Sequence, residues 1–196
     1  WYNGDIMSEL NVNTITEYTT NNGVTIDGVL VKDGAIASSY VSGLTTGLDT
    51  AQQWRLTANI TSPTGASTIS TNLSSPTNSS FGSLGSLVSE TSGIFSFSET
   101  GYYLVIVGSM VGGGKQTHII TQLTADNSTY TDFAGAGTLS DTEGVRGGSS
   151  YCLLDITDTT NMKVRFQSYI QSAGGTIYGS TTANNTSFTF LKLGDT

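Results

Sequence analysis

The side chains that most often carry catalysis or bind metals are scarce in this sequence and lie far apart. His118 is the only histidine and Cys152 the only cysteine, so one chain can build neither a Ser-His-Asp triad nor a histidine-based metal cluster. His118 precedes Ile119 in a predicted strand, 115–123, which favours a surface or interface histidine. Cys152 lies in the apolar run 151–154, where a small buried side chain is favoured over a reactive thiol.

Two short stretches concentrate oxygen-bearing side chains. Residues 126–132 and 155–161 each contain aspartate and asparagine side chains, which are ligands that calcium accepts. Both stretches also lie where turns are expected, and the same residue types form turns in their own right. The turn interpretation is favoured, so we expect no metal or other cofactor, and calcium is the one ion that needs a test.

The evidence for other catalytic groups is equally weak. Asp141 and Glu143 could form a carboxylate pair of the glycosidase type, but no neighbour that would raise the pKa of either is visible. The run Gly112-Gly-Gly114-Lys115 lacks the second half of a phosphate-binding loop and leads into a strand. We therefore expect no catalytic centre.

Composition excludes several partners. The 196 residues include 24 glycines, only 11% are charged, and the net charge is −8. Phosphate binding requires a basic face, so nucleic acid is excluded as a partner. No run approaches the roughly 18 apolar residues of a membrane span. An acidic, weakly charged chain of this kind fits the surface of an extracellular particle or filament.

Alternating apolar residues predict an all-β fold. Phe95 and Phe97 alternate before a corner at 99–101, and Tyr103 resumes the alternation after it, which predicts a half-buried antiparallel strand pair. Further strands are predicted at 54–60, 66–73, 102–111, 115–123, 130–133, 150–156, 162–169 and 187–193. This number of short strands predicts a jelly-roll β-sandwich over residues 51–196.

Residues 1–50 differ from the rest and are predicted to form a stalk and a connector. The turn dipeptides Asn22-Gly23, Asp27-Gly28 and Asp33-Gly34 bracket two very short strands. Such strands are unstable alone in water, so we expect copies of the segment to bury four aliphatic side chains between chains: Ile26, Leu30, Val31 and Ile36. The alternative, a floppy linker, is disfavoured by the concentration of Val, Ile and Leu.

Three motifs of the head resemble those of complement component 1q-like and tumour-necrosis-factor-like jelly rolls. They are Phe95-x-Phe97-x-x-x-Gly101-x-Tyr103, Leu153-x-Asp155-x-x-Asp158-x-x-x-Met162-x-Val164 and Ser187-Phe-Thr-Phe190-Leu-Lys-Leu193. The segments 13–19, 23–34, 53–57, 81–85 and 92–95 resemble parts of bacteriophage tail-fibre and virion proteins. Together these resemblances cover nearly the whole chain.

The resemblance implies a homotrimer on the surface of a virion assembled in the host cytoplasm. Four aromatic residues, Phe95, Tyr103, Phe188 and Phe190, are expected in the core of the heads or around the threefold axis of the trimer. The implied function is a phage tail fibre or spike tip that contacts other virion proteins and a host-surface glycan or protein. Two alternatives stay open: a capsid-decorating fibre or cement protein, and a polysaccharide-degrading tailspike enzyme, which the scarcity of titratable residues disfavours.

The alternation of strand direction predicts where a receptor would bind. If both ends of the head domain lie at its base, connections 112–114, 135–148 and 171–185 lie at its apex. These connections carry four candidate receptor-binding residues, Asp141, Glu143, Arg146 and Tyr178. Exposed aromatic rings among hydroxyl and amide groups suit sugar binding, and loops on a rigid scaffold commonly carry binding sites. The alternative is that these connections are only solvated turns.

Overall fold

The computed structural model describes residues 24–26, 29–32, 35–36, 48, 50–61, 63–76, 83–113, 116–139 and 144–196. All regular structure in these ranges is β-strand, which confirms the predicted all-β class. Within the same ranges no helix is long and apolar enough to cross a membrane. The chain divides into two units, Trp1–Thr46 and Gly47–Thr196, and the second begins close to the head boundary expected at residue 51.

The first unit contains a small antiparallel sheet of three strands, β1 (Val24–Ile26), β2 (Val29–Lys32) and β3 (Ala35–Ile36). Its register places Val31 opposite both Val24 and Ile36. The two short strands expected between the turn dipeptides are present, and they pair with each other within one chain. The dipeptides themselves and the side chains of Ile26, Leu30, Val31 and Ile36 lie outside the described residues, so their burial between chains stays a prediction.

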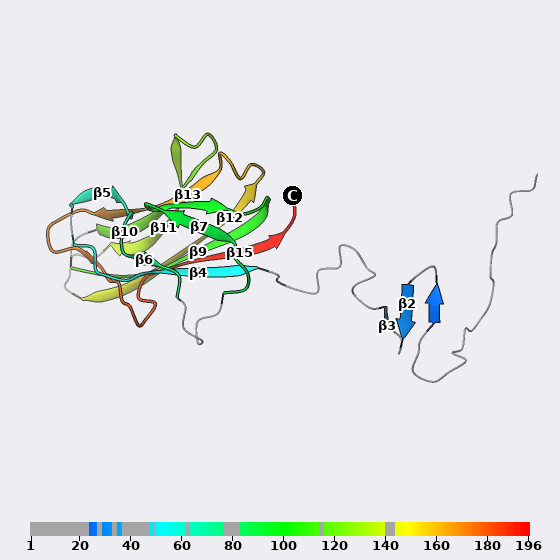
Figure 1. The fold of residues 1–196 in the computed structure, drawn as a ribbon. Coiled ribbons are helices and arrows are strands. Elements are labelled where there is room, and N and C mark those ends of the chain that lie inside the picture. The colour runs from blue at the N-terminus through cyan, green and yellow to red at the C-terminus, as the bar shows by residue number, and fades with distance from the viewer. Residues whose placement is uncertain are drawn as a thin grey trace, which may run out of the picture. The chain divides into compact units, whose positions relative to one another are not determined.

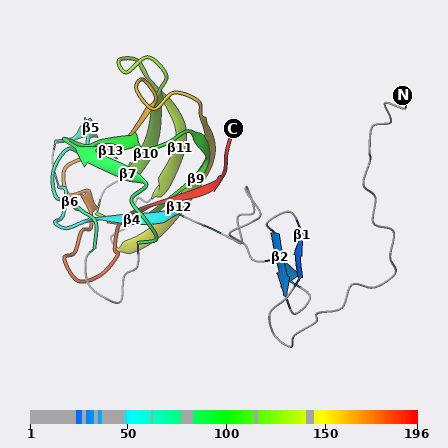
Figure 2. The ribbon, with the colours of Figure 1, turned by 45° about the vertical axis from the view of Figure 1, so that its right-hand side comes forward.

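The second unit, here called the head, is a sandwich of two antiparallel sheets (Figures 1 and 2). The first sheet has the order β11-β10-β13-β8-β7, with β5 also pairing with β13. Its strands are β5 (Gly65–Thr68), β7 (Val88–Thr91), β8 (Ile94–Phe97), β10 (Gln116–Thr124), β11 (Tyr130–Leu139) and β13 (Lys163–Ile170).

The second sheet of the head has the order β12-β9-β15-β4-β6, with β14 also pairing with β9. Its strands are β4 (Ala51–Leu56), β6 (Leu73–Ser74), β9 (Gly101–Gly112), β12 (Val145–Ile156), β14 (Thr176–Ile177) and β15 (Ser187–Gly194). Strand β15 ends where β4 begins (Figure 1), and Lys192 N donates to Thr50 O at 3.2 Å. Both ends of the head domain therefore lie at one end of the sandwich, so the condition set for an apical position of the three connections is met.

Aromatic rings from both sheets form the centre of the core. Phe95 on β8 lies 5.3 Å from Phe166 on β13, in its own sheet, and 5.4 Å from Trp54 and 5.2 Å from Phe190 in the other sheet, measured between ring centroids. Phe166 stacks on Phe188 across the sandwich at 4.1 Å. These contacts hold the two sheets together, because each ring packs against rings of the opposite layer.

This arrangement decides between the two positions expected for the predicted interface aromatics. Phe95, Tyr103, Phe188 and Phe190 are each 0% exposed within a single chain. A side chain with no accessible surface in one chain cannot contact a neighbouring copy of that chain. The four residues are therefore core residues of one head and not residues of a face between heads.

The strand pair predicted around the corner at 99–101 is wrong in its pairing. Strand β8 pairs with β7 and β13, whereas β9 pairs with β12, β15 and β14, so the corner carries the chain from one sheet to the other. The actual hairpin partner of β8 is β7, joined through Ser92 and Gly93, whose φ values of 52° and 84° suit a tight hairpin turn. Apolar alternation reveals which face of a strand is buried, but not which strand lies beside it.

One side of the sandwich is closed by a close approach of backbones. A Cβ atom on Gly148 of β12 would lie 2.6 Å from the N atom of Gly137 on β11, which belongs to the other sheet. The Ser109 hydroxyl lies 3.2 Å from both Ala136 O and Gly148 O and can donate to either. Glycine is required at this closure because no side chain fits between the two strands.

We predict that Phe95→Ala lowers the free energy of unfolding by about 3–5 kcal/mol, because it removes a fully buried ring and leaves a cavity between the sheets. Urea unfolding of the purified chain measures this loss. Phe133→Ala is the matched control, since Phe133 is half exposed on β11, and it should cost no more than about 1 kcal/mol. Equal losses for the two variants would contradict the central role of the cluster.

Candidate functional site

The outer side of the second sheet carries an exposed apolar face. We define this apolar face as Tyr102, Leu104, Ile106, Tyr151, Leu153 and Leu191. Register partners bring Leu153, Leu104 and Leu191 into one row across β12, β9 and β15, and Tyr151 lies opposite Ile106 in the next row. Tyr151 is 76% exposed, Leu153 61% and Tyr102 42%, and the other three residues are half-buried. Contiguous apolar surface of this kind on a soluble domain usually marks an interaction site.

The alternation of β12 explains how the face arises. Ser150, Leu154 and Ile156 are buried on its inner side, and Cys152 between them is half-buried against the core. Burial raises the pKa of the Cys152 thiol, in agreement with the packing role predicted for it. The residues between them, Tyr151 and Leu153, point to the opposite side and are apolar as well. Around residues 151–154 both sides of this strand are thus apolar.

The apolar face ends at β4, where the same side of the sheet becomes polar. Gln53 Nε2 donates to Thr189 Oγ1 at 3.0 Å, and Asn184 Nδ2 donates to Gln53 Oε1 at 2.5 Å. Arg55 is only 3% exposed, and its Nη1 donates to Thr181 O at 3.0 Å. The segment before β15 therefore covers the β4 side, and the β12 side is left open.

The end of the head opposite to the C-terminus, here called the far end, gathers the connections predicted at the apex. Gly112 of β9 pairs with both Val145 of β12 and Thr176 of β14. A Cβ atom on Gly112 would lie 3.0 Å from the Tyr178 ring and 3.1 Å from Gly144 O, so the tyrosine lies against the glycine backbone. The structure therefore places Tyr178 at the far end, the apical position expected for connection 171–185, and its contact with a receptor stays a prediction.

The structure does not place the other three candidate receptor-binding residues in a described connection at the far end. Arg146 is exposed, but it lies within β12 rather than in a connection, because β11 and β12 reach further than predicted and leave only residues 140–144 between them. Asp141 and Glu143 lie outside the described residues. The far end thus brings together Tyr178 and the start of β12, with Arg146 opposite Val111 in register.

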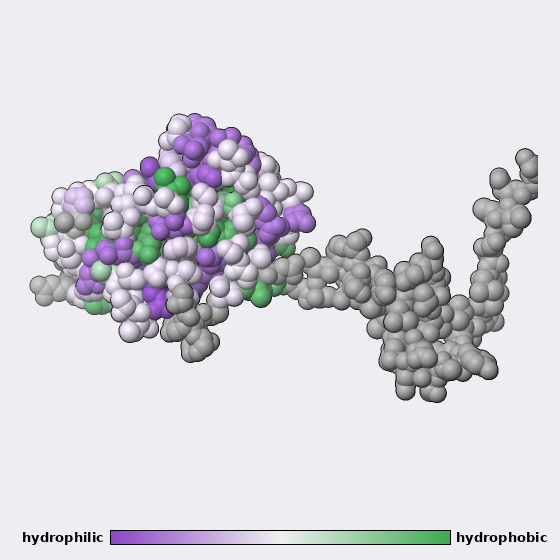
Figure 3. Space-filling view, in the orientation of Figure 1, coloured by the Kyte–Doolittle hydropathy of each residue, from purple (hydrophilic) through white to green (hydrophobic). Residues whose placement is uncertain are grey.

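The two aspartate-containing stretches form turns at the opposite end of the head. Asp126 Oδ1 accepts hydrogen bonds from Thr124 Oγ1, Ser128 N and Thr129 N at 2.7–2.9 Å. Asp158 Oδ1 likewise accepts from Thr160 N at 2.8 Å, and Asn127 N donates to Asn161 O, which joins the two turns. In Figure 3 the projection at the top of the head, to which these turns belong, is hydrophilic.

These hydrogen bonds set the acidity of both carboxyl groups. The N–H groups of the turn at 126–129, with the Thr124 hydroxyl, hold the pKa of Asp126 far below its usual value. Donation from the Asn161 side chain and from the Thr160 and Asn161 N–H groups lowers the pKa of Asp158. Both carboxylates are thus engaged in their own turns, which supports the turn interpretation. In the part of the chain that the structure describes, no three His, Cys, Asp or Glu side chains cluster as a metal site.

A polar relay lies on the outer side of the first sheet. Arg165 Nε donates to Gln122 Oε1 at 2.7 Å, Gln122 Nε2 donates to Asp132 Oδ1 at 2.6 Å, and the Arg165 guanidinium lies 3.8 Å over the Tyr130 ring. His118 stacks on Tyr169 nearby, and its pKa is lowered chiefly by burial, against an opposing effect of Asp132. His118 is half-buried on this outer side, which agrees with the surface or interface position predicted for it.

The fold of the head resembles that of several solved structures. No protein-family model and no curated protein sequence matches the chain. Among solved structures, murine APRIL superposes with a TM-score of 0.54 at 9% identity, over 74% of this chain and 98% of the other. Eiger TNF from S. frugiperda gives 0.53 at 13% identity, over 76% and 96%. The head has a tumour-necrosis-factor-like jelly-roll fold.

A third solved structure, the globular domain of a zebrafish complement 1qA protein, matches with a TM-score of 0.48 at 11% identity, over 75% of this chain and 99% of the other. At identities this low, likeness concerns the fold alone. The jelly roll predicted from the three motifs of the head is confirmed by the two antiparallel sheets and by the likeness to APRIL and Eiger TNF.

The exposed apolar face was missed by the reasoning from sequence, although a signal for it exists. Residues 151–154 are a continuous apolar run, and strands that are covered on both sides show such runs in place of alternation. The run was interpreted only as the surroundings of a buried Cys152. The residues on β9 and β15 that complete the face become neighbours only through strand pairing.

We predict that Asp126→Ala lowers the melting temperature at neutral pH, because the turn loses the acceptor for its N–H groups. The Asp126 pKa is lowered in the folded state, so its contribution is fully present above about pH 4, the usual value for aspartate. It should decline as the pH falls below that value. Thermal melts of wild type and variant across this range measure the effect.

The control for this prediction is Asp155→Ala, an exposed aspartate on β12, whose melting temperature should stay close to that of wild type at neutral pH. Chelator should leave the melting temperature of the wild type unchanged. A difference between Asp126→Ala and wild type that grew as the pH fell would contradict the sign worked out here.

Proposed function

We propose that this chain is a bacteriophage virion protein, a homotrimeric tail fibre or spike tip whose heads contact the host cell surface. The fibre would stand on the outside of the particle, joined to other virion proteins through its N-terminal unit. Its work would be binding rather than catalysis, since the side chains that could form a catalytic centre are few and separate. The observation that carries the proposal is the exposed apolar face of β12, β9 and β15.

A single head would leave this face in water at a considerable cost. Fully burying a Leu side chain that was exposed contributes roughly 1.5–3 kcal/mol. The face presents the largely exposed Tyr151 and Leu153 beside half-buried apolar side chains in adjacent rows. Copies of the same chain are the partner always present at assembly, and closed symmetric oligomers dominate among soluble proteins. Three heads that pack their apolar faces against one another would remove this surface from water.

The far end supports the receptor-contacting part of the proposal. Tyr178 lies over the Gly112 backbone, and the exposed Arg146 is the second residue of β12, which pairs with β9. A ring held against a backbone loses little freedom when it binds a ligand, and a sugar can stack on it. The alternative virion role, decoration of the capsid, uses the same trimer and differs in copy number per particle.

We predict that the intact chain is a trimer at micromolar concentration, measurable by sedimentation equilibrium. The double variant Tyr151→Glu, Leu153→Glu should weaken association by placing like charges in the buried interface. Phe133→Glu is the matched control, because Phe133 is similarly exposed but lies on the other sheet. Adding Leu30→Asp, which tests the predicted contact between N-terminal units, should complete the dissociation. A wild-type monomer would refute the proposed assembly.

We predict that Tyr178→Ala and Arg146→Ala reduce adsorption of the particle to host cells at least about tenfold when combined, because both groups face the proposed receptor. Adsorption counts on phage carrying the variant chain measure this. Thr131→Ala, on the exposed surface of β11, should leave adsorption unchanged. Normal adsorption by trimeric Tyr178→Ala, Arg146→Ala particles would assign the receptor contact elsewhere or the protein to the capsid.

A further inference from the structure

A hydroxyl-lined groove lies between the two arms of the segment that follows β4. Residues 59–61 form one arm, where Ile60 and Ile177 exchange backbone hydrogen bonds at 2.9 Å. Residues 67–72 form the other, where Ile69 N donates to Phe166 O at 2.8 Å. The first arm is thus attached to β14 in one sheet and the second to β13 in the other. The groove between them has a volume of about 290 Å³, near the lower end for small-ligand sites.

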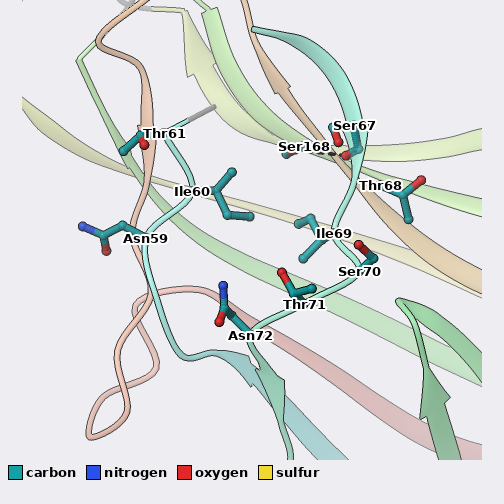
Figure 4. A pocket seen from close by; sticks show the side chains of 10 residues that line it. All are labelled: Asn59, Ile60, Thr61, Ser67, Thr68, Ile69, Ser70, Thr71, Asn72 and Ser168. Atoms are coloured by element: carbon teal, nitrogen blue, oxygen red, sulfur yellow. Dashed lines mark hydrogen bonds between the residues drawn. The ribbon is translucent and has the colours of Figure 1, made fainter. Parts of the chain in front are cut away.

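The accessible walls of the groove are mostly polar, with the half-buried Ile60 and the buried Ile69 among the lining residues. Ile60 and Ile69 extend from the two arms toward one another, and Thr71 and Asn72 point toward the same gap (Figure 4). Ile69 is only 3% exposed, whereas Thr71 and Asn72 are exposed. At the back, the Ser168 hydroxyl, which is buried, donates to Ser67 O at 3.0 Å.

The chemistry of the walls restricts the ligand. The ten lining residues are two isoleucines and eight residues that carry a hydroxyl or an amide, and none of the ten ionises. Without a cation the groove offers nothing to balance a phosphate or carboxylate, and without a carboxylate it offers nothing for an amine. Hydroxyls and amides both donate and accept hydrogen bonds. Their natural complement is a neutral molecule with many hydroxyl groups.

The rim retains free hydrogen-bonding capacity. Within the part of the chain that the structure describes, the side chains of Thr71 and Asn72 make no hydrogen bond, while Asn72 O accepts from both the N–H and the hydroxyl of Thr57. The Asn72 backbone is therefore held in place and its amide group is available. Asn59 Oδ1 accepts from Gly179 N at 3.0 Å, which connects the groove to the Tyr178 segment at the far end.

We propose that this groove binds a neutral sugar residue, with its hydroxyls on Thr71 and Asn72 and its ring beside the half-buried Ile60. The inference deepens the proposed receptor-contacting role and rests on it only for the source of the sugar, a glycan of the cell surface. Binding of a free sugar to the isolated chain depends neither on a phage particle nor on a host.

The test is a titration of the labelled intact chain with glucose, galactose, mannose and N-acetylglucosamine at millimolar concentration, followed by amide chemical shifts. We expect at least one sugar to produce saturable shifts confined to residues 59–61, 67–72 and their bonded neighbours. Glucuronate should bind no more tightly than glucose, since the groove holds no cation. No saturable shift with any neutral sugar, or tighter binding of glucuronate, would overturn the proposal.

Two variants remove the polar contacts without disturbing the fold. Thr71→Val keeps the shape of the side chain, and Asn72→Gly keeps a backbone whose φ is 60°, a conformation that glycine adopts freely. Each should weaken sugar binding by up to about tenfold, the effect of one lost hydrogen bond. Thr131→Val, on exposed β11, is the matched control and should bind as wild type. Unchanged binding by both groove variants would overturn the site.

Competition separates this inference from the proposed function. If the same free sugar also blocks adsorption of the particle to cells, both the sugar site and the receptor-contacting role are supported. If the sugar binds the groove but does not block adsorption, the groove remains a sugar site and the receptor role assigned to it is refuted.

Discussion

The packing of Phe95 across the sandwich is the interaction on which the remaining structure depends. Its ring contacts rings from β13 in its own sheet and from β4 and β15 in the other. Short strands paired within one sheet are not stable unless a face is buried, and here each sheet supplies the apolar face that the other requires. The positions of the outer faces, of the turns at both ends and of the groove all follow from this alignment of the two layers.

Much of the head could be predicted because this packing leaves a local trace in the sequence. The alternation of Phe188 and Phe190 predicted the last strand almost to the residue, and the observed β15 spans Ser187–Gly194. Strand β7 was missed because only one of its four residues, Val88, is buried. Residues 135–148 were predicted as a loop because they are rich in glycine, yet most lie in β11 and β12. Their glycines allow the close approach of these two strands.

The candidate functional site likewise has a part that could be predicted from the sequence and a part that could not. Counting strand directions was enough to place Tyr178 at the far end, since that argument needs only an even alternation of strands. The apolar face could not be located in this way, because Leu104, Leu153 and Leu191 come from three strands whose order is set by long-range pairing. Aromatic residues in the sequence were likewise ambiguous between core and interface, and only their complete burial within one chain resolved them.

The two open sides of the β-sandwich are closed here by different means, and this difference explains where the groove opens. On the side of β11 and β12, Gly137 and Gly148 bring the backbones so close that no side chain fits between them. On the opposite side the chain leaves β4, bonds to β14 through Ile60, and returns along β13 through Ile69. A segment that is attached to both sheets spans the opening without filling it, because its two arms are held apart by the thickness of the core. A groove lined by the side chains of those arms is the geometric consequence, and their hydroxyl and amide character determines what it can hold.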